Sequence, residues 1–559
     1  MVRRILSILN RELGGLHKAA LLLAFSALGS SILGLFRDRL LASNFGAGRT
    51  LDIYYAAFKI PDLLYTILLA LVSVTVFIPT FLEKNSQGQK EAKDFFNQVF
   101  TVFLLCFLVA CLLLFFVVPI LAPLLAPGFS LEEKRQMVAL ARTMLFSPFF
   151  MGLSTIFSGV VQSFRKFFIY ALSPLVYNIG IIIGITLFFP LAGLKGIVFG
   201  VVLGSFLHMI IQVPTLMSLD MFPALSPKIN FKEIRKIVLL SFPRTVGLAT
   251  NQIILFFVTS MSSLLVPGSI AIFNFSYALQ TVPLTIIGMS FSVAAFPTLA
   301  RFFVGKEKGK FLDYTYSAAR QIIFWSMPVT ILFIVLRAQI VRVILGAGRF
   351  SWTDTKLTAA ALAVFSLSVM AQSLVMLFTR AYFAAGKTVK PIFINVFTSL
   401  LIIVFAYSIT TIFSFFPGAE TFYKKILRVS DIADTRILVF PLAFSLNNLI
   451  NAVWIYFAFK KDLGGGSSSL RRMFYHVLFA SLLMGYVAYF MLNLLDKVFD
   501  LTTFVGIFMQ GFISGLIGLA VWYFTLRFLE NKELEEITSS LKQKFWKDQN
   551  IAADPQNLP

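Results

Sequence analysis

A small group of charged side chains falls inside, or at the ends of, the long apolar stretches of this chain: Arg37, Asp38, Asp52, Lys59 and Arg244. A charged residue within a membrane-spanning helix costs about 2.5–3.5 kcal/mol on insertion scales, and such residues usually have a function. The chemistry we expect of them is ionic binding inside a polar cavity. The sequence therefore predicts that these residues line a cavity within a membrane.

Each of these residues also has a plainer explanation, which the sequence leaves open. Arg37 could extend its side chain to the membrane surface. Asp38 could be its local charge partner, although adjacent residues on a helix do not face each other. Asp52 is well placed to cap the helix that it begins. Lys59 and Arg244 stand near helix ends, where long cationic side chains commonly reach headgroups.

The residue types that catalysis needs do not come together in the sequence. The three histidines, His17, His208 and His476, lack metal-ligand spacing, and no apolar stretch holds two carboxylates three or four residues apart. No phosphate-binding loop is present, so an ion gradient, the membrane potential or substrate supply must provide the energy. We expect no enzyme and no cofactor, with Na+ or the membrane potential as candidate driving forces.

The elements that position these residues are membrane-spanning helices. The chain has 559 residues, of which 58% are hydrophobic and 13% charged, whereas a soluble protein has about 25% charged residues. A helix of about 20 apolar residues crosses the hydrocarbon core. We therefore predict an all-α membrane protein with about fourteen spans. Their approximate limits are 19–43, 53–81, 95–125, 137–163, 167–190, 193–217, 237–265, 269–300, 314–344, 357–384, 390–415, 437–459, 473–495 and 501–528.

The basic residues predict how these spans are oriented. The net charge is +22, but the Lys and Arg residues sit mainly in short gaps between apolar runs, which argues against nucleic acid as a partner. With a cytoplasmic N-terminus, the inside segments carry roughly twice as many basic residues as the outside ones. We expect both termini to be cytoplasmic.

An internal repeat predicts how the spans are grouped. Four matches recur in the same order after about 220 residues. They pair Gly46 with Gly268, Pro61 with Pro283, Gly128–Ser130 with Arg349–Ser351, and Pro174–Asn178 with Pro391–Asn395. The period covers six spans, so both halves enter the membrane in the same orientation, as in parallel-repeat transporters. We predict six-helix lobes at 1–218 and 219–462, two further spans at 463–530, a cytoplasmic tail at 531–559, and alternating access through a midline cleft.

Several motifs carry a family resemblance. They are Ser30–Asp38, Phe45–Gly48, Asp52, Ala57–Pro61, Ala126–Phe129, Phe164–Phe167, Ser173–Asn178 and Ala384–Pro391. Together they resemble the MurJ (MviN) family of lipid II flippases, in the MOP exporter superfamily, over roughly residues 20 to 460. The first block is the more specific one, and the span count agrees.

The resemblance implies a flippase of the bacterial inner membrane that moves undecaprenyl-diphosphate-linked disaccharide-pentapeptide to the outer leaflet for peptidoglycan assembly. A diphosphate would bind to Arg and Lys, and the last two spans would provide a groove for the lipid tail. Some family members also bind sodium, and Asn251, Asn395 and Ser399 fall near the corresponding spans. The expected partners are an anionic lipid-linked substrate and membrane lipids, with a monomer working near the cell-wall synthesis machinery.

Some positions depart from the family pattern. Ser31, Tyr65, Thr66 and Ala278 stand where the family carries arginines, and Thr281 stands where it carries a glutamate. Arg244 could restore positive charge to the cavity. Two alternatives stay open: an exporter of the same superfamily for polysaccharide-repeat lipids or amphipathic drugs, and a membrane scaffold that transports nothing.

Overall fold

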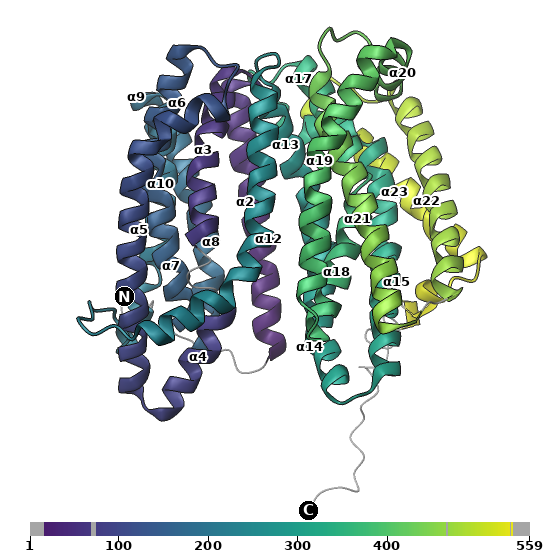
Figure 1. Cartoon of the computed structure of the whole chain (residues 1–559). Helices are drawn as coiled ribbons and strands as arrows, with labels where there is room; N and C mark the ends of the chain where they lie inside the picture. The colour runs from purple at the N-terminus through teal and green to yellow at the C-terminus, as the bar shows by residue number, and fades with distance from the viewer. Residues whose placement is uncertain (1–15, 69–73, 466–467, 537, 540–559) are drawn as a thin grey trace, which may run out of the picture. The chain divides into compact units, whose positions relative to one another are not determined.

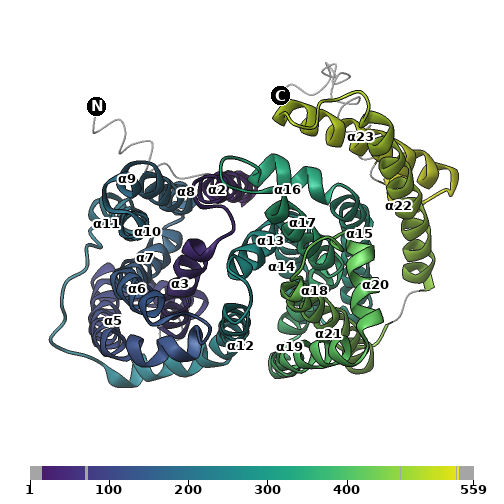
Figure 2. The same cartoon turned by 90° about the horizontal axis from the view of Figure 1, so that it is seen from above.

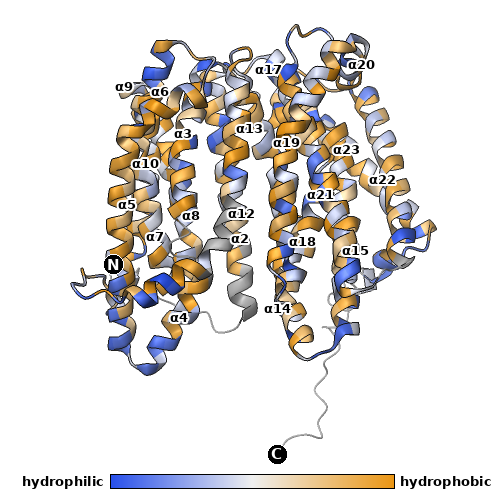
Figure 3. Cartoon of the chain, viewed as in Figure 1, coloured by the Kyte–Doolittle hydropathy of each residue, from blue (hydrophilic) through white to orange (hydrophobic). Residues whose placement is uncertain are grey.

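The computed structural model describes residues 16–68, 74–465, 468–536 and 538–539, and these residues form α-helices joined by short loops, with no strand among them (Figure 1). Hydrophobic residues occupy most of the length of the helices, and hydrophilic residues gather near their ends (Figure 3). This distribution is what a helix needs when lipid surrounds its middle and water meets its ends.

The helices follow one another along the chain with few interruptions. They are α2 (Leu16–Phe45), α3 (Arg49–Leu68), α4 (Val74–Gln87), α5 (Gln89–Leu125), α6 (Leu131–Met144), α7 (Phe146–Ser163), α8 (Phe167–Ile183), η1 (Gly184–Phe188), α9 (Phe189–Ala192), α10 (Leu194–Ile210), α11 (Val213–Ser218), α12 (Phe231–Ser263), α13 (Ser269–Pro283), η2 (Leu284–Met289), α14 (Ser290–Val304), α15 (Lys308–Val335), α16 (Arg337–Leu345), α17 (Trp352–Ser366), α18 (Val369–Ala384), α19 (Val389–Phe415), α20 (Pro417–Leu427), η3 (Arg436–Leu438), α21 (Val439–Leu463), α22 (Ser468–Leu495) and α23 (Phe504–Phe528).

Within the described residues, ten helical segments are long and apolar enough to cross a membrane, and the bent pair α17–α18 makes an eleventh if it counts as one span. Each of these segments falls on a predicted span. The other three predicted spans fall on α2, on α3 with α4, and on α12. The all-α, multi-span class is confirmed, and the number fourteen stays a prediction. One boundary is wrong, because the span predicted at 314–344 ends at Val335 and α16 follows as a separate helix.

The chain divides into two compact units. One contains Met1–Leu279, Ile344–Ala361 and Ile392–Ala443, and the other contains Gln280–Val343, Leu362–Pro391 and Phe444–Pro559. The predicted lobe boundaries and tail groove stay predictions. Most of the predicted tail at 531–559 lies outside the described residues.

In the first unit, α8 packs between α2 and α10 (Figure 2). Glycines allow α8 and its extension η1 to approach α10 closely. A Cβ atom on Gly180 would lie 2.3 Å from the Cα of Gly204, and one on Gly200 would lie 2.4 Å from the Cα of Gly184. Small residues at such contacts let membrane helices associate through backbone packing.

In the second unit, α15 packs against α22, and α22 packs against α23. Their shared core is made of aromatic, aliphatic and methionine side chains: Ile323, Phe324, Met327, Met473, Val477, Ala480, Met484, Trp522, Leu526 and Leu534. The last two spans are therefore held by side-chain packing against α15.

The repeat seen in the sequence appears again in local structure. Ser130 and Glu133 cap α6 reciprocally: Ser130 N donates to the Glu133 carboxylate at 2.7 Å and Glu133 N to Ser130 Oγ at 3.3 Å. Ser351 and Asp354 do the same at the start of α17, at 2.9 and 3.1 Å. The two matched serines, Ser130 and Ser351, therefore both form a capping box at the start of a helix.

Two matched glycines are also alike in the structure. Gly46 and Gly268 have φ angles of 64° and 95°, which favour glycine. A Cβ atom on Gly46 would lie 2.7 Å from the carbonyl oxygen of Arg349, and one on Gly268 would lie 2.0 Å from that of Ala47.

Pro283 ends α13 and is followed directly by the π-helix η2, as a proline that removes a helix hydrogen bond can cause.

We expect Gly200→Ala to lower the stability of the protein by about 1–3 kcal/mol, because the added methyl group would force α10 away from η1. Gly309→Ala is the matched control, because nothing lies within 4 Å of its Cβ position. Thermal unfolding in detergent, followed by intrinsic fluorescence, measures both. Equal midpoints for the two variants would contradict close backbone packing at Gly200.

Candidate functional site

Arg37 makes the central polar contacts of α2. Its Nε and Nη2 atoms donate to Asp38 Oδ1 at 3.0 and 2.8 Å, and Nη1 donates to Asn178 Oδ1 at 3.3 Å. Asp38 is thus the local charge partner that the sequence left open. Its side chain is 7% exposed and that of Arg37 is 27% exposed. The guanidinium is held in place by these bonds, and the Arg37 side chain is only partly covered.

Asn178 of α8 fixes this pair to the neighbouring helix. Its Nδ2 atom donates to Ser30 Oγ at 3.2 Å and to the carbonyl oxygen of Pro174 at 3.1 Å. The Asn178 amide thereby contacts α2 at two residues: its nitrogen donates to Ser30, and its oxygen accepts from Arg37. The sequence marked Asn178 as part of the repeat and of a family motif, and it did not predict this contact.

Lys59 lies on α3, and its Nζ atom donates to Asn274 Oδ1 of α13 at 3.5 Å. This long single hydrogen bond leaves most of the hydrogen-bonding capacity of the ammonium group unused. Lys59 is half-buried. Its hydrogen bond joins it to Asn274 within the same compact unit. A side chain that only reached the membrane surface would not make this contact.

Asp62 is a charged residue of α3 that sequence reasoning missed. It follows Lys59 by one helical turn and interacts with it electrostatically. Tyr177 of α8 lies within electrostatic range of both Asp62 and Arg37. The available signal was a carboxylate inside the predicted span 53–81, three residues after a lysine. We call Arg37, Asp38, Lys59, Asp62 and Tyr177 the polar wall.

Asp52 caps a helix, but the helix is α13 and not its own, so the predicted cap of α3 is wrong. The carboxylate accepts hydrogen bonds from Gly268 N at 2.7 Å and from Ala271 N at 2.9 Å. Asp52 is 1% exposed. A carboxylate at this place satisfies amides that have no partner within the helix and complements the positive end of its dipole.

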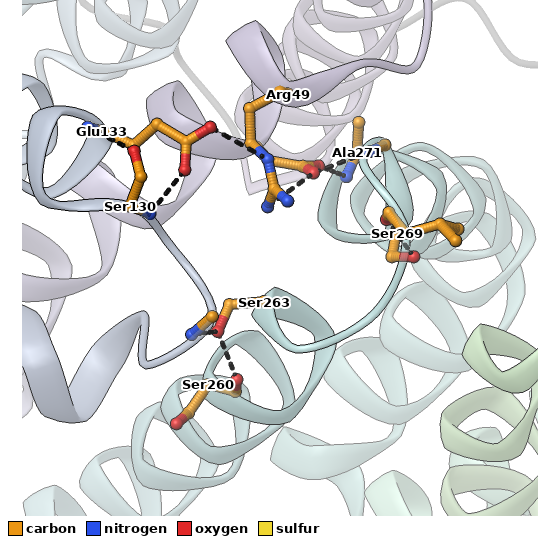
Figure 4. Close-up of polar contacts among 11 residues, drawn as sticks. Arg49, Ser130, Glu133, Ser260, Ser263, Ser269 and Ala271 are labelled. Carbon is orange, nitrogen blue, oxygen red and sulfur yellow. Dashed lines mark hydrogen bonds and ion pairs between the residues drawn. The ribbon is translucent and has the colours of Figure 1, made fainter.

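Arg49 connects the Asp52 cap to α6 (Figure 4). Its Nε atom lies 3.3 Å from the Glu133 carboxylate, its Nη1 atom lies 4.0 Å from the Asp52 carboxylate, and its guanidinium lies over the Phe129 ring at 5.0 Å. Arg49 was also missed from the sequence. Its position three residues before Asp52 was the signal for an ion pair on one helix face.

Two serines of α12 complete the contacts at this end of the helices (Figure 4). Ser263 Oγ accepts from Gly128 N at 3.2 Å, and Ser260 Oγ donates to the carbonyl oxygen of Leu124 at 2.7 Å. We call the contacts of Arg49, Asp52, Glu133, Ser260 and Ser263 the end latch. It ties α3, α5 and α6 to α12 and α13.

The remaining predicted site residues lie on α12 and α19. The backbone of Arg244 is in α12, and its side chain lies outside those that the structure describes. Asn251 of α12 forms a side-chain hydrogen bond with Tyr277 of α13. Asn395 and Ser399 are one turn apart on α19. The sodium site at these three residues stays a prediction.

The family assignment rests on the comparison with known proteins. The model of the family described as lipid II flippase MurJ matches residues 41–510. The chain belongs to this family. It is therefore a multi-pass membrane protein of the MurJ family, which confirms the resemblance seen in the sequence motifs.

Individual MurJ relatives support the same assignment. A probable lipid II flippase MurJ from Buchnera aphidicola is 30% identical over 394 residues, which are 69% of this chain and 76% of the relative. The probable lipid II flippase MurJ of Thermotoga maritima is 26% identical over 480 residues, or 83% of this chain and 96% of the relative.

Solved structures share the fold. A lipid II flippase MurJ in an inward closed conformation has a TM-score of 0.72 and 24% identity, covering 90% of this chain and 99% of that one. An inward-facing multidrug resistance MATE transporter of the MOP superfamily has a TM-score of 0.63 and 13% identity, and the match covers 79% of this chain and 96% of that one.

We expect Asp52→Ala to increase hydrogen–deuterium exchange at the backbone amides of 268–271, because Gly268 N and Ala271 N lose their acceptor. Each buried amide left without a partner costs about 1–3 kcal/mol. Mass spectrometry of peptides that cover 266–272 measures the change. Asp500→Ala is the control: its carboxylate accepts from Thr502 N, so it should raise exchange at Thr502 and leave exchange at 268–271 unchanged. Unchanged exchange at 268–271 in Asp52→Ala would contradict the cap.

Proposed function

We propose that this protein moves lipid II, the undecaprenyl-diphosphate-linked precursor of peptidoglycan, from the inner to the outer leaflet of the bacterial inner membrane. The family match over residues 41–510 carries this proposal. The polar wall supports it, because two cations on neighbouring membrane helices suit an anionic head group that has to pass through an apolar layer.

Arg37 is the residue best prepared to bind the diphosphate. Asp38 and Asn178 hold its guanidinium by hydrogen bonds, so little conformational freedom is lost on binding. Its exposed side can present the paired N–H groups that bind phosphate oxygens. Lys59 adds a second positive charge with donors to spare. The two residues would bind the head group while the lipid tail stays in the membrane.

Alternating access would use the end latch. In this proposal both termini are cytoplasmic, so the latch lies at the outer side and has to open for the head group to leave. Its hydrogen bonds join α3, α5 and α6 to α12 and α13, which are the helices that must separate. The membrane potential or a Na+ gradient would bias the opening.

We also propose that the protein works as a monomer near the cell-wall synthesis machinery.

A second candidate is an exporter of the same superfamily with a different amphipathic substrate. Tyr65 and Ala278 stand where the resemblance implies cavity arginines, and the fold is shared with a MATE transporter. The family match favours lipid II over this alternative.

The test is complementation of a bacterium that is depleted of its own lipid II flippase. We expect the paired variant Arg37→Met, Asp38→Asn to express normally and to fail in complementation, because it removes the guanidinium without leaving a buried carboxylate unpaired. Its affinity for labelled lipid II should fall about tenfold or more, as expected when hydrogen bonds to a charged group are lost. Arg135→Ala is the control, since that side chain is 70% exposed on α6. If the wild-type protein fails to complement and does not bind lipid II, the cargo is a different one.

A further inference from the structure

Asp62 differs from the other two carboxylates of α2 and α3. Asp38 accepts two hydrogen bonds from Arg37, and Asp52 accepts two from backbone amides of α13. Among the groups that the structure describes, none donates a hydrogen bond to the Asp62 carboxylate, and the charge that acts on it is that of Lys59. The described residues therefore leave the hydrogen-bonding capacity of the Asp62 carboxylate unused.

A carboxylate without donors is expensive inside a membrane-spanning helix, at about 2.5–3.5 kcal/mol on insertion scales. Asp62 is half-buried, so its carboxylate remains accessible. Its neighbours are also polar: Tyr177 and Tyr65 both interact with it electrostatically. A carboxylate that accepts no hydrogen bond from the described residues and lies in such a setting points to a ligand of opposite charge.

The position of Asp62 relative to Arg37 indicates what kind of ligand this is. Arg37 interacts electrostatically with Tyr54 and Tyr55 of α3, and Asp62 follows Tyr55 by seven residues, about 10 Å along the helix. Tyr177 of α8 lies within electrostatic range of both charges. A cation and an anion thus lie near the same tyrosine, which suits a molecule with both kinds of charge.

We propose that Asp62, together with the Tyr177 hydroxyl, binds a primary ammonium group of the substrate. This inference rests on the proposed function. The lipid II head group carries an anionic diphosphate and, on the diamino acid of its peptide stem, a free primary amine. The diphosphate would lie at Arg37 and the ammonium group at Asp62.

An ammonium group fits these residues better than a metal cation does. It has three N–H donors, which a carboxylate and a tyrosine hydroxyl can accept, and aromatic rings beside it add a cation–π attraction. A metal cation needs more oxygen ligands than these residues supply. The Tyr65 hydroxyl is already engaged with Thr155 Oγ1 at 3.1 Å. Asp62 is therefore a specificity residue, because it favours substrates that carry an amine.

The test compares two forms of lipid II: one with the stem amine free and one with that amine acetylated. We expect the purified wild-type protein to bind the free-amine form about tenfold more tightly, because acetylation removes the charge that Asp62 recognises. Asp62→Asn should bind both forms with the affinity that the wild type shows for the acetylated form. Asp496→Asn is the matched control, since that residue is exposed after α22, and it should keep the tenfold preference.

The outcomes separate this inference from the proposed function. Equal wild-type affinity for the two forms, or a preference that survives in Asp62→Asn, overturns the role of Asp62 and leaves lipid II as the cargo. Absence of binding to either form overturns the proposed function itself. If Asp62→Asn removes a sodium dependence of binding and keeps the amine preference, the residue binds the ion, and the inference fails. The wild-type comparison needs no variant, so equal affinity for the two forms overturns the inference even if Asp62→Asn misfolds.

Discussion

Charges that enter a membrane must find their partners within the protein, because lipid supplies none. Most charged residues of α2 and α3 obey this constraint through contacts with other helices. Arg37 is held by Asp38 and by Asn178 of α8. Asp52 is held by the first amides of α13. These contacts join helices that are far apart in the sequence, so the requirement to satisfy charge also determines which helices meet.

The same constraint gives the end latch its chemistry. The contacts there include hydrogen bonds and ion pairs, together with close backbone approaches at glycine. Hydrogen bonds and ion pairs of this kind can be exchanged for hydrogen bonds to water. In the proposed function this end opens, and its polar contacts suit that role, whereas the core shared by α15, α22 and α23 is apolar.

The polar wall combines both signs of charge, and this decides how selective it can be. A wall with cations alone would attract any anionic lipid of the membrane. The presence of Asp62 beside Lys59 reduces that attraction and adds a requirement of its own. The proposed specificity for a head group with separated charges uses Arg37 of α2 and Asp62 of α3. Tyr65 and Ala278 stand where the resemblance implies further arginines.

The sequence alone determined what depends on local composition and local order. Apolar length predicted the spans, the shared offset paired Ser130 with Ser351, and the motif around Arg37 predicted the family. Tertiary structure decided the partners. Asp52 caps α13 across more than two hundred residues, and Arg49 and Asp62 matter because of neighbours on α6 and α8. A hydrogen bond depends on distance in space, and a one-dimensional pattern does not specify which helix ends fold together.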